Sequence, residues 1–211
     1  MNFVRLFATV SMCVLFCGTV SAQNVVAKGS QQSSDRSNSK TVSPYKKFVL
    51  DFSNEVVNVR NSKLPPAEAK ARFVDIANRY VAIEGISKFL LAANYRKLSD
   101  ENKKKVQICV RNLMATRLLA ELPHGESITK TITEEKELPN KHWMITVEYF
   151  VDGKKYEVVF SIFDRKHGPQ IFDVIINGVS ASKIQRADID GNIAEIGFNK
   201  FLERFFKTYA D

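Results

Sequence analysis

The sequence predicts an α+β domain in which helices curl over one face of a four-stranded antiparallel sheet. Up to about residue 122, apolar side chains recur every three or four positions, as they do in amphipathic helices. After Pro123 apolar and polar residues alternate, as they do in strands, and a helical stripe returns near the C-terminus. Helices and antiparallel strands segregated in this way are typical of α+β domains.

The first 22 residues have the layout of a secretory signal peptide. Arg5 supplies a positive charge, residues 7–16 are almost wholly apolar, and residues 19–22 offer small side chains at a cleavage site. The apolar run is shorter than the ~20 residues that a membrane span needs. Cys17 suggests a lipid-modified N-terminus, but Phe16 occupies a position where such a site needs a small residue, so we expect cleavage after Ala22.

Removal of residues 1–22 leaves a polar leader and one domain. Residues 23–43 are rich in Ser, Gln, Asn and Lys and bury too little apolar surface to become ordered, so the domain is expected over residues 44–211. Loss of Arg5 lowers the formal charge from +8 to +7, and two of the three cysteines leave with it. Cys109 then has no cysteine to pair with, and its apolar neighbours favour a buried side chain over a reactive thiol.

Four helices are expected before Pro123. Ser43-Pro44 begins the first helix with a capping hydroxyl and a proline in the first turn, and Leu64-Pro65-Pro66 opens the second. The third helix covers residues 83–91, and we expect Gly85 to interrupt it. The fourth begins at Ser99-Asp100-Glu101, with acids in its first turn, and runs to about Leu122. It is expected to bury Val106, Cys109, Val110, Leu113 and Leu118.

Four strands are expected to form a meander. They cover residues 128–133, 143–151, 156–162 and 171–179, with tight turns at Val151–Lys154 and Arg165–Gly168. Alternation places Ile145, Val147 and Tyr149 on one face, and Tyr156, Val158 and Phe160 on the matching face of the next strand. A last helix is expected after Asn192.

The sequence contains few groups arranged for catalysis. His124, His142 and His167 fall at loops or strand ends and lack the spacing of a helical zinc site. No nucleophile elbow, phosphate-binding loop or dinucleotide-binding motif occurs, and we expect no metal and no cofactor. Asp173 and Glu157 lie on different strands and would form an acid pair if they faced each other, although most strand acids face solvent.

A small cavity enzyme of the isomerase or hydrolase type is therefore the alternative to a binding protein. It would need a polar side chain inside the curled sheet, and the apolar strand faces offer Tyr149 and Tyr156. The basic residues are dispersed through turns and polar helix faces, so the charge either keeps the protein soluble or steers it toward acidic membranes and partners. We expect no nucleic-acid partner for an exported chain.

The C-terminal third resembles the MlaC family, also called toluene-tolerance auxiliary proteins. The family's Asp-Val-x-x-x-Gly-Val-Ser strand matches residues 173–180, Asp-Val-Ile-Ile-Asn-Gly-Val-Ser, and an arginine-bearing segment at 183–186 and an apolar helix through Phe205 follow. Residues 73–99 resemble the family's helix pair, so the likeness covers about residues 44–209. Pro169 stands where the family usually has tryptophan, and Ala92 stands in place of a glycine.

The resemblance implies a periplasmic carrier that shuttles phospholipid between the outer and inner membranes and so maintains outer-membrane lipid asymmetry. Its implied partners are an inner-membrane Mla-type ABC transporter complex and an outer-membrane lipoprotein complex, and we expect a monomer without enzymatic activity. Some relatives are linked to hopanoids, which are an alternative cargo. Basic residues expected beside the cavity mouth, for docking or for solubility, are Arg96, Lys97, Lys103, Lys104, Lys105, Lys183 and Arg186.

An apolar lipid cavity also follows from the resemblance. Composition alone favours a solid core. An acyl chain gains ~0.8 kcal/mol per buried methylene, so a carrier needs a deep apolar slot and no catalytic group. The expected lining lies on the concave sheet face and on the helices above it: Phe89, Leu90, Tyr95, Val147, Tyr149, Val158, Phe160, Val174, Ile176 and Val179.

Overall fold

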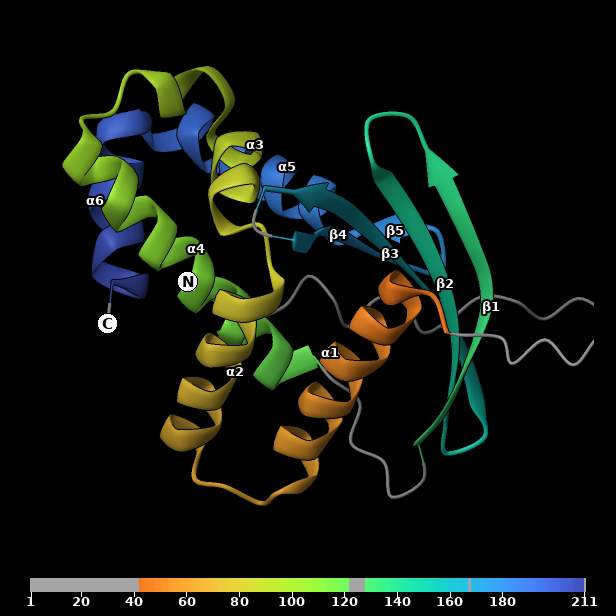
Figure 1. Cartoon of the computed structure of the whole chain (residues 1–211). Helices are drawn as coiled ribbons and strands as arrows, with labels where there is room; N and C mark the ends of the chain where they lie inside the picture. The colour runs from red at the N-terminus through yellow and green to blue at the C-terminus, as the bar shows by residue number, and fades with distance from the viewer. Residues whose placement is uncertain (1–41, 122–127, 167, 211) are drawn as a thin grey trace, which may run out of the picture. The chain divides into compact units, whose positions relative to one another are not determined.

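The computed structural model describes residues 42–121, 128–166 and 168–210, so the predicted signal peptide and almost all of the leader lie outside it. Six helices and five strands follow one another in this part of the chain (Figure 1). The helices are α1 Pro44–Asn61, α2 Pro66–Tyr80, α3 Ile83–Arg96, α4 Asp100–Glu121, α5 Ala181–Ile196 and α6 Phe198–Tyr209. The strands are β1 Ile128–Leu138, β2 His142–Val151, β3 Lys154–Arg165, β4 Gly168–Ile176 and β5 Val179–Ser180.

The predicted α+β class is confirmed, and the strands form one antiparallel sheet in the order β1-β2-β3-β4-β5. The expected matching faces of the central hairpin are confirmed too, because Val147 lies opposite Val158 and Tyr149 opposite Tyr156. The expected count of four strands is wrong. Asn177 and Gly178, with φ values of 48° and 81°, turn the chain after β4 so that Val179 pairs with Ile176 in a fifth strand.

Strand β1 extends five residues beyond the predicted end at residue 133. Its charged second half lacks apolar alternation, so the periodicity did not predict it, and Glu135 in this half reaches the N-terminus of α1. There its carboxylate accepts a hydrogen bond from the Ser43 hydroxyl and lies 3.2 Å from Lys46 Nζ. The pairing with β2 shifts register between Ile132 and Glu134.

The predicted last helix is present as α6, which begins after Asn192. Asn192 itself lies in α5, a helix that was not predicted, because α5 buries only Ile189 and so shows no regular apolar stripe. The predicted interruption of α3 is wrong. Gly85 does not interrupt α3, whose irregular residue is Ala92, with φ 46° and ψ −122°. A residue with a side chain rarely adopts these backbone angles, because its Cβ comes too close to the backbone, whereas glycine adopts them readily.

The helices bury their apolar faces in two clusters. One joins α1 and α2 to the inner face of the sheet, through residues such as Val49, Phe52, Ile145 and Phe160. The other joins α3, α4, α5 and α6. Figure 1 shows α1 lying against the sheet and α4 between α2 and α6, which agrees with the contacts among these elements. On α4, Val106, Cys109, Val110 and Leu113 are buried as predicted.

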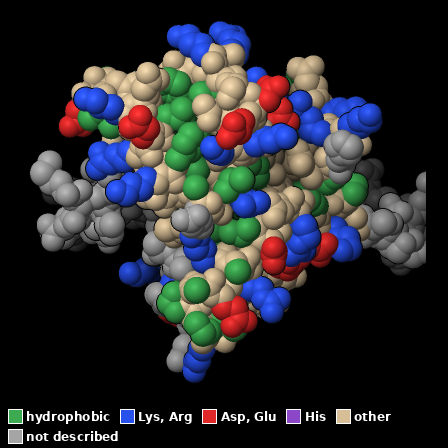
Figure 2. Space-filling view, turned by 90° about the vertical axis from the view of Figure 1, so that its left-hand side faces the viewer, with side chains coloured by type: hydrophobic (Ala, Val, Ile, Leu, Met, Phe, Trp, Pro, Cys, Tyr) green, Lys and Arg blue, Asp and Glu red, His purple; other side chains and the backbone are tan. Residues whose placement is uncertain are grey.

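Three lysines on α3 and α4 are paired with acids of their own helix. Lys103 Nζ lies 2.9 Å from Asp100 and Lys105 Nζ lies 2.8 Å from Glu101. Lys88 on α3 lies 2.6 Å from Glu84 in the same manner. Figure 2 accordingly shows acidic side chains among the lysines and arginines, not a continuous basic patch.

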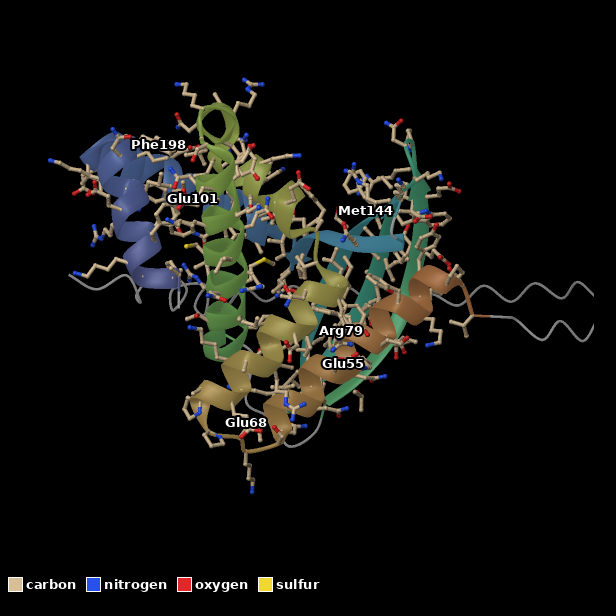
Figure 3. All side chains as sticks on the ribbon, turned by 60° about the vertical axis from the view of Figure 1, so that its left-hand side comes forward. Glu55, Glu68, Arg79, Glu101, Met144 and Phe198 are labelled. Carbon is tan, nitrogen blue, oxygen red and sulfur yellow. The ribbon has the colours of Figure 1, made fainter. Side chains whose placement is uncertain are left out.

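A clamp of three polar side chains fastens α1 to α2. Arg79 binds Glu55 with both terminal nitrogens, one at 2.6 Å (Figure 3). Tyr80 Oη donates to Glu55 Oε1 at 2.7 Å. The hydrogen bond from Arg79 lowers the pKa of Glu55, and burial together with Glu55 raises the pKa of Tyr80 to about 12. The Tyr80 ring packs against both apolar clusters, so the clamp fixes the residue at which they meet.

Asp173 connects the end of the sheet to α5. Its carboxylate accepts the Ser180 hydroxyl at 2.6 Å and the Ser182 backbone N–H at 2.9 Å, while Ser180 Oγ caps α5 by accepting from Lys183 N at 3.1 Å. The sequence 173–180 is therefore a strand, a tight turn and a helix cap held by one carboxylate.

We predict that Ala92→Gly stabilises the protein. Glycine removes the backbone strain at φ 46°, and the expected gain in the free energy of unfolding is about 1 kcal/mol, or about 2–4 °C in Tm. Thermal unfolding followed by circular dichroism measures it. The matched control is Ala93→Gly, one residue on in the same helix, which should cost about as much as the first change gains. A loss of stability in Ala92→Gly would contradict the strained backbone.

We predict that Asp173→Ala destabilises the protein by about 1–2 kcal/mol, because the Ser182 N–H and the Ser180 hydroxyl lose their acceptor. Urea unfolding measures the change. Asp75→Ala, on the exposed face of α2, is the control and should change the free energy of unfolding little. Equal stability of the two variants would show that the cap is not required.

Candidate functional site

An apolar row crosses the inner face of the whole sheet. Ile132, Val147, Val158, Ile176 and Val179 lie opposite one another in register on the five consecutive strands. Val147 is fully buried, Val158 is half-buried, and Ile176 and Val179 are 46% and 47% exposed. The row thus begins in the core and ends at the surface, and four of its members belong to the predicted lining.

A second row lies beside the first and is closed by α1. Ile145, Phe160 and Val174 follow one another across β2, β3 and β4. The Phe160 ring meets the Phe52 ring of α1 edge to face, with centroids 5.9 Å apart. Six of the ten predicted lining residues belong to the apolar cluster that joins α1 and α2 to the sheet, or border it. They are Val147, Tyr149, Val158, Phe160, Val174 and, through its pairing with Val158, Ile176.

Three predicted lining residues lie elsewhere, on α3. Leu90 and Tyr95 are buried in the helical cluster, where Tyr95 Oη accepts from Gln107 Nε2 at 2.9 Å. Phe89 packs edge to face on Phe172 of β4, with centroids 5.8 Å apart, and carries the Arg186 guanidinium over its ring. These residues and the sheet rows therefore belong to different parts of the interior.

A polar pair interrupts the apolar surface between α1 and β2. Ser53 Oγ and Tyr149 Oη lie 2.5 Å apart, and Ser53 is only 3% exposed. Burial raises the pKa of the Tyr149 phenol, against a smaller lowering by the bond to Ser53, so the phenol is protonated at neutral pH. Sequence reasoning missed Ser53. Ser53 lies four residues after Val49 in the buried stripe of α1, which also contains Phe52 and Val56. A hydroxyl within an otherwise apolar stripe was the signal that could have identified it.

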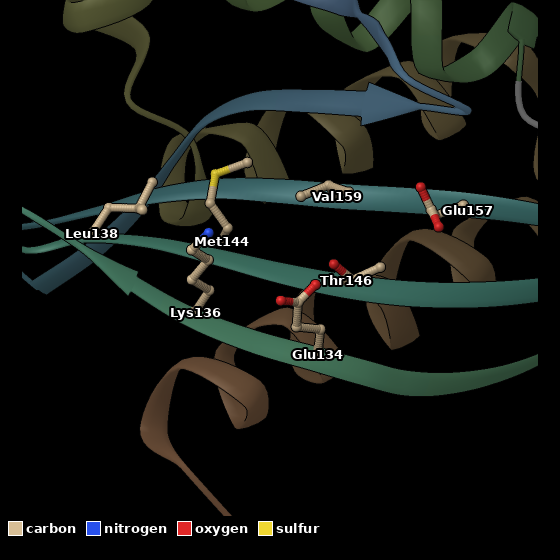
Figure 4. Close-up of a pocket in the computed structure, with 7 residues that line it drawn as sticks. All are labelled: Glu134, Lys136, Leu138, Met144, Thr146, Glu157 and Val159. Carbon is tan, nitrogen blue, oxygen red and sulfur yellow. The ribbon is translucent and has the colours of Figure 1, made fainter.

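The outer face of the sheet has a shallow hollow of about 350 Å³. Figure 4 shows its lining on β1, β2 and β3, which is Glu134, Lys136, Leu138, Met144, Thr146, Glu157 and Val159. Strand alternation puts these side chains on the face opposite Val147 and Phe160, and three of them are charged. The hollow is therefore separate from the predicted apolar lining, whose residues pack against one another and against α1.

The side chains considered for catalysis have structural partners. Asp173 lies opposite Ser161 and holds the α5 cap, whereas Glu157 lies beside Asn177, so the two acids do not face each other. His142 Nε2 lies 2.8 Å from Ser161 Oγ, and its ring stacks on Phe163. His124 and His167 lie outside the described residues. Burial raises the pKa of Cys109 to about 11, as expected for a thiol in a core.

Within the described ranges, no group of three or more potential metal ligands gathers. The described helices also include none with the length and hydropathy of a membrane span. Among the described residues, the inner face offers an apolar surface that carries the hydroxyl pair of Ser53 and Tyr149 and is exposed at its β4–β5 end. Such a surface suits the binding of an apolar molecule better than acid–base chemistry.

Comparison with known proteins agrees with the resemblance seen in the sequence. Among solved structures, the phospholipid-binding protein from Ralstonia solanacearum, determined in complex with a phospholipid, has a similar fold with a TM-score of 0.61. The match covers 78% of this chain and 98% of that chain at 11% sequence identity, so it concerns the fold alone. A search of curated proteins finds no match. The family model described as MlaC protein matches residues 47–206, and the chain therefore belongs to the MlaC family.

Proposed function

We propose that this protein is a periplasmic carrier that binds phospholipid by its acyl chains and shuttles it between the outer and inner membranes. Membership of the MlaC family and the fold shared with a phospholipid-binding protein support the proposal. Export by the predicted signal peptide, cleaved near Ala22, brings the chain to the periplasm. The lipid is cargo, and the sheet and helices supply the surface that replaces its membrane environment.

The observation that carries the proposal is the apolar row with an exposed end. Ile176 and Val179 leave about half of their surface in water, although they continue the buried row of Val147. An acyl chain on this row gains ~0.8 kcal/mol per methylene removed from water. Five strands about 4.8 Å apart make a row of about 19 Å, enough for the ~15 Å that acyl chains occupy in one leaflet.

Occupation of the row requires the inner face to open. Val147 and Phe160 are packed against α1, so a lipid tail entering from Ile176 moves inward by displacing contacts between α1 and the sheet. The predicted lining on the sheet then contacts the tail, while Leu90 and Tyr95 hold the helical cluster in place. The head group stays in water outside the covered inner face.

We predict that Ile176→Glu prevents lipid binding without unfolding the protein. A carboxylate at the exposed end of the row would have to lose its water when a tail passes, while the half-exposed site lets the apo protein keep its fold. The variant is mixed with phospholipid vesicles and recovered, and its retained lipid is measured by native mass spectrometry; we expect at least a tenfold loss.

The matched control is Ile108→Glu, an isoleucine on α4 that is 37% exposed and outside the row. It should retain as much lipid as the wild type. Val147→Glu is less informative, because a carboxylate at a fully buried position is expected to unfold the protein. Undiminished binding by Ile176→Glu, or a lipid-free wild type, would count against the proposal.

We further propose that the carrier docks on an inner-membrane Mla-type ABC transporter complex and an outer-membrane lipoprotein complex. The expected net charge of +7 would attract the carrier to acidic surfaces of these complexes. Lys103 and Lys105 are paired with acids of their own helix and Arg186 lies 3.4 Å from Asp190, so the long-range field of the whole surface matters more than any free cluster.

We predict that lipid transfer between vesicles bearing these complexes slows steeply from low to high salt, since salt shortens the screening length to a few ångströms. Equilibrium retention of lipid, which depends on apolar contact, should change little. A fluorescent-lipid transfer assay measures both. Replacement of Lys103, Lys104 and Lys105 by Glu should reproduce the slowing at low salt. Transfer that is indifferent to salt and to this reversal would show that docking is not electrostatic.

A further inference from the structure

The hydroxyl pair of Ser53 and Tyr149 has one more proton than its own hydrogen bond uses. Each hydroxyl carries one proton, and the 2.5 Å bond between them employs one of the two. Among the described residues, neither hydroxyl makes a second hydrogen bond. A buried donor without an acceptor costs free energy, so its retention needs an explanation.

The neighbouring side chains of the pair do not supply the missing acceptor. On α1 the adjoining buried residues are Val49, Phe52 and Val56, and along β2 the same face continues with Val147. Lys130 lies opposite Tyr149 on β1, but its ammonium only donates, and it donates to Asn54. Among the described side chains next to the pair, none therefore accepts the remaining proton.

We propose that this proton is donated to an ester carbonyl of the bound lipid, and that the pair makes the carrier selective for ester-linked glycerophospholipids. This inference rests on the proposed function. An ester carbonyl accepts hydrogen bonds and has no proton to donate, which complements the pair. It also joins the apolar tail to the polar glycerol, and Tyr149 lies two residues, about 6.8 Å, along β2 from the row on which we place the tail.

The phenol suits this role at the pH of the envelope. Burial raises the pKa of Tyr149 further above neutrality, so the group remains a donor. A lipid whose chains are ether-linked, or a hopanoid without an ester, offers no carbonyl oxygen to the pair. Such lipids would leave the proton without a partner in the complex, as it is in the free protein.

The test compares dioleoyl phosphatidylglycerol with its diether analogue, which has the same head group and chain length. The protein is incubated with vesicles that contain both lipids in equal amounts, and the ratio of the two retained lipids is measured by native mass spectrometry. One hydrogen bond to a neutral carbonyl gives an expected preference of the wild type for the ester of about five- to tenfold. The double variant Ser53→Ala/Tyr149→Phe should retain both lipids equally.

The double variant is expected to fold, because removing both partners leaves no unsatisfied group; circular dichroism and Tm check this. Tyr149→Phe alone should shift the ratio in the same direction and serves if the double variant unfolds. Tyr156→Phe removes the same hydroxyl from the cross-strand neighbour of Tyr149 and should keep the wild-type ratio. An equal ratio in the wild type, a preference that survives in the folded double variant, or an equal loss in Tyr156→Phe would overturn the inference. If the wild type retained neither lipid, the proposed function itself would be wrong.

Discussion

The packing of α1 on the inner face of the sheet is the contact on which the rest of the structure depends. Phe52 and its neighbours meet Ile145 and Phe160 there, and the Ser43 cap at the start of the helix is tied to Glu135 of β1. The same helix carries Glu55, through which it holds α2, and Ser53, which bonds Tyr149. One helix thus covers the surface assigned to the lipid and connects that surface to the remaining helices.

In the proposed carrier, the division of the interior into two clusters separates stability from binding. The helical cluster around Leu90, Tyr95 and Val110 has no member on the apolar row, so the proposed exchange of contacts between α1 and the sheet for acyl chains leaves it intact. Tyr80 touches both clusters and is fixed by Glu55 and Arg79. A protein that replaces part of its core contacts by a ligand needs a second core that stays packed, because the free energy of unfolding of a domain is small.

The sequence predicted most of what depends on periodicity and less of what depends on single residues. The helical stripes and the shared face of Val147 and Val158 follow from apolar spacing, and the structure has both. Helix α5 was not predicted because it buries a single residue, and strand β5 was not predicted because it is two residues long. Neither element therefore shows apolar periodicity in the sequence. The spacing of residues along the chain could not predict that the lining residues are divided between α3 and the sheet, or that Tyr149 bonds Ser53. Both depend on tertiary contacts.

The free edge of the sheet has a consequence for how the protein behaves in a crowded compartment. Strand β1 has no neighbour on its outer side within the described sheet, and an uncovered edge recruits strands from other molecules. Here the edge changes register at Ile132/Glu134 and its second half carries Glu134, Glu135, Lys136 and Glu137. A charged, irregular edge resists strand-to-strand association. Pairing between the sheets of two copies of the chain is therefore disfavoured, also in the opened state that the proposed lipid exchange requires.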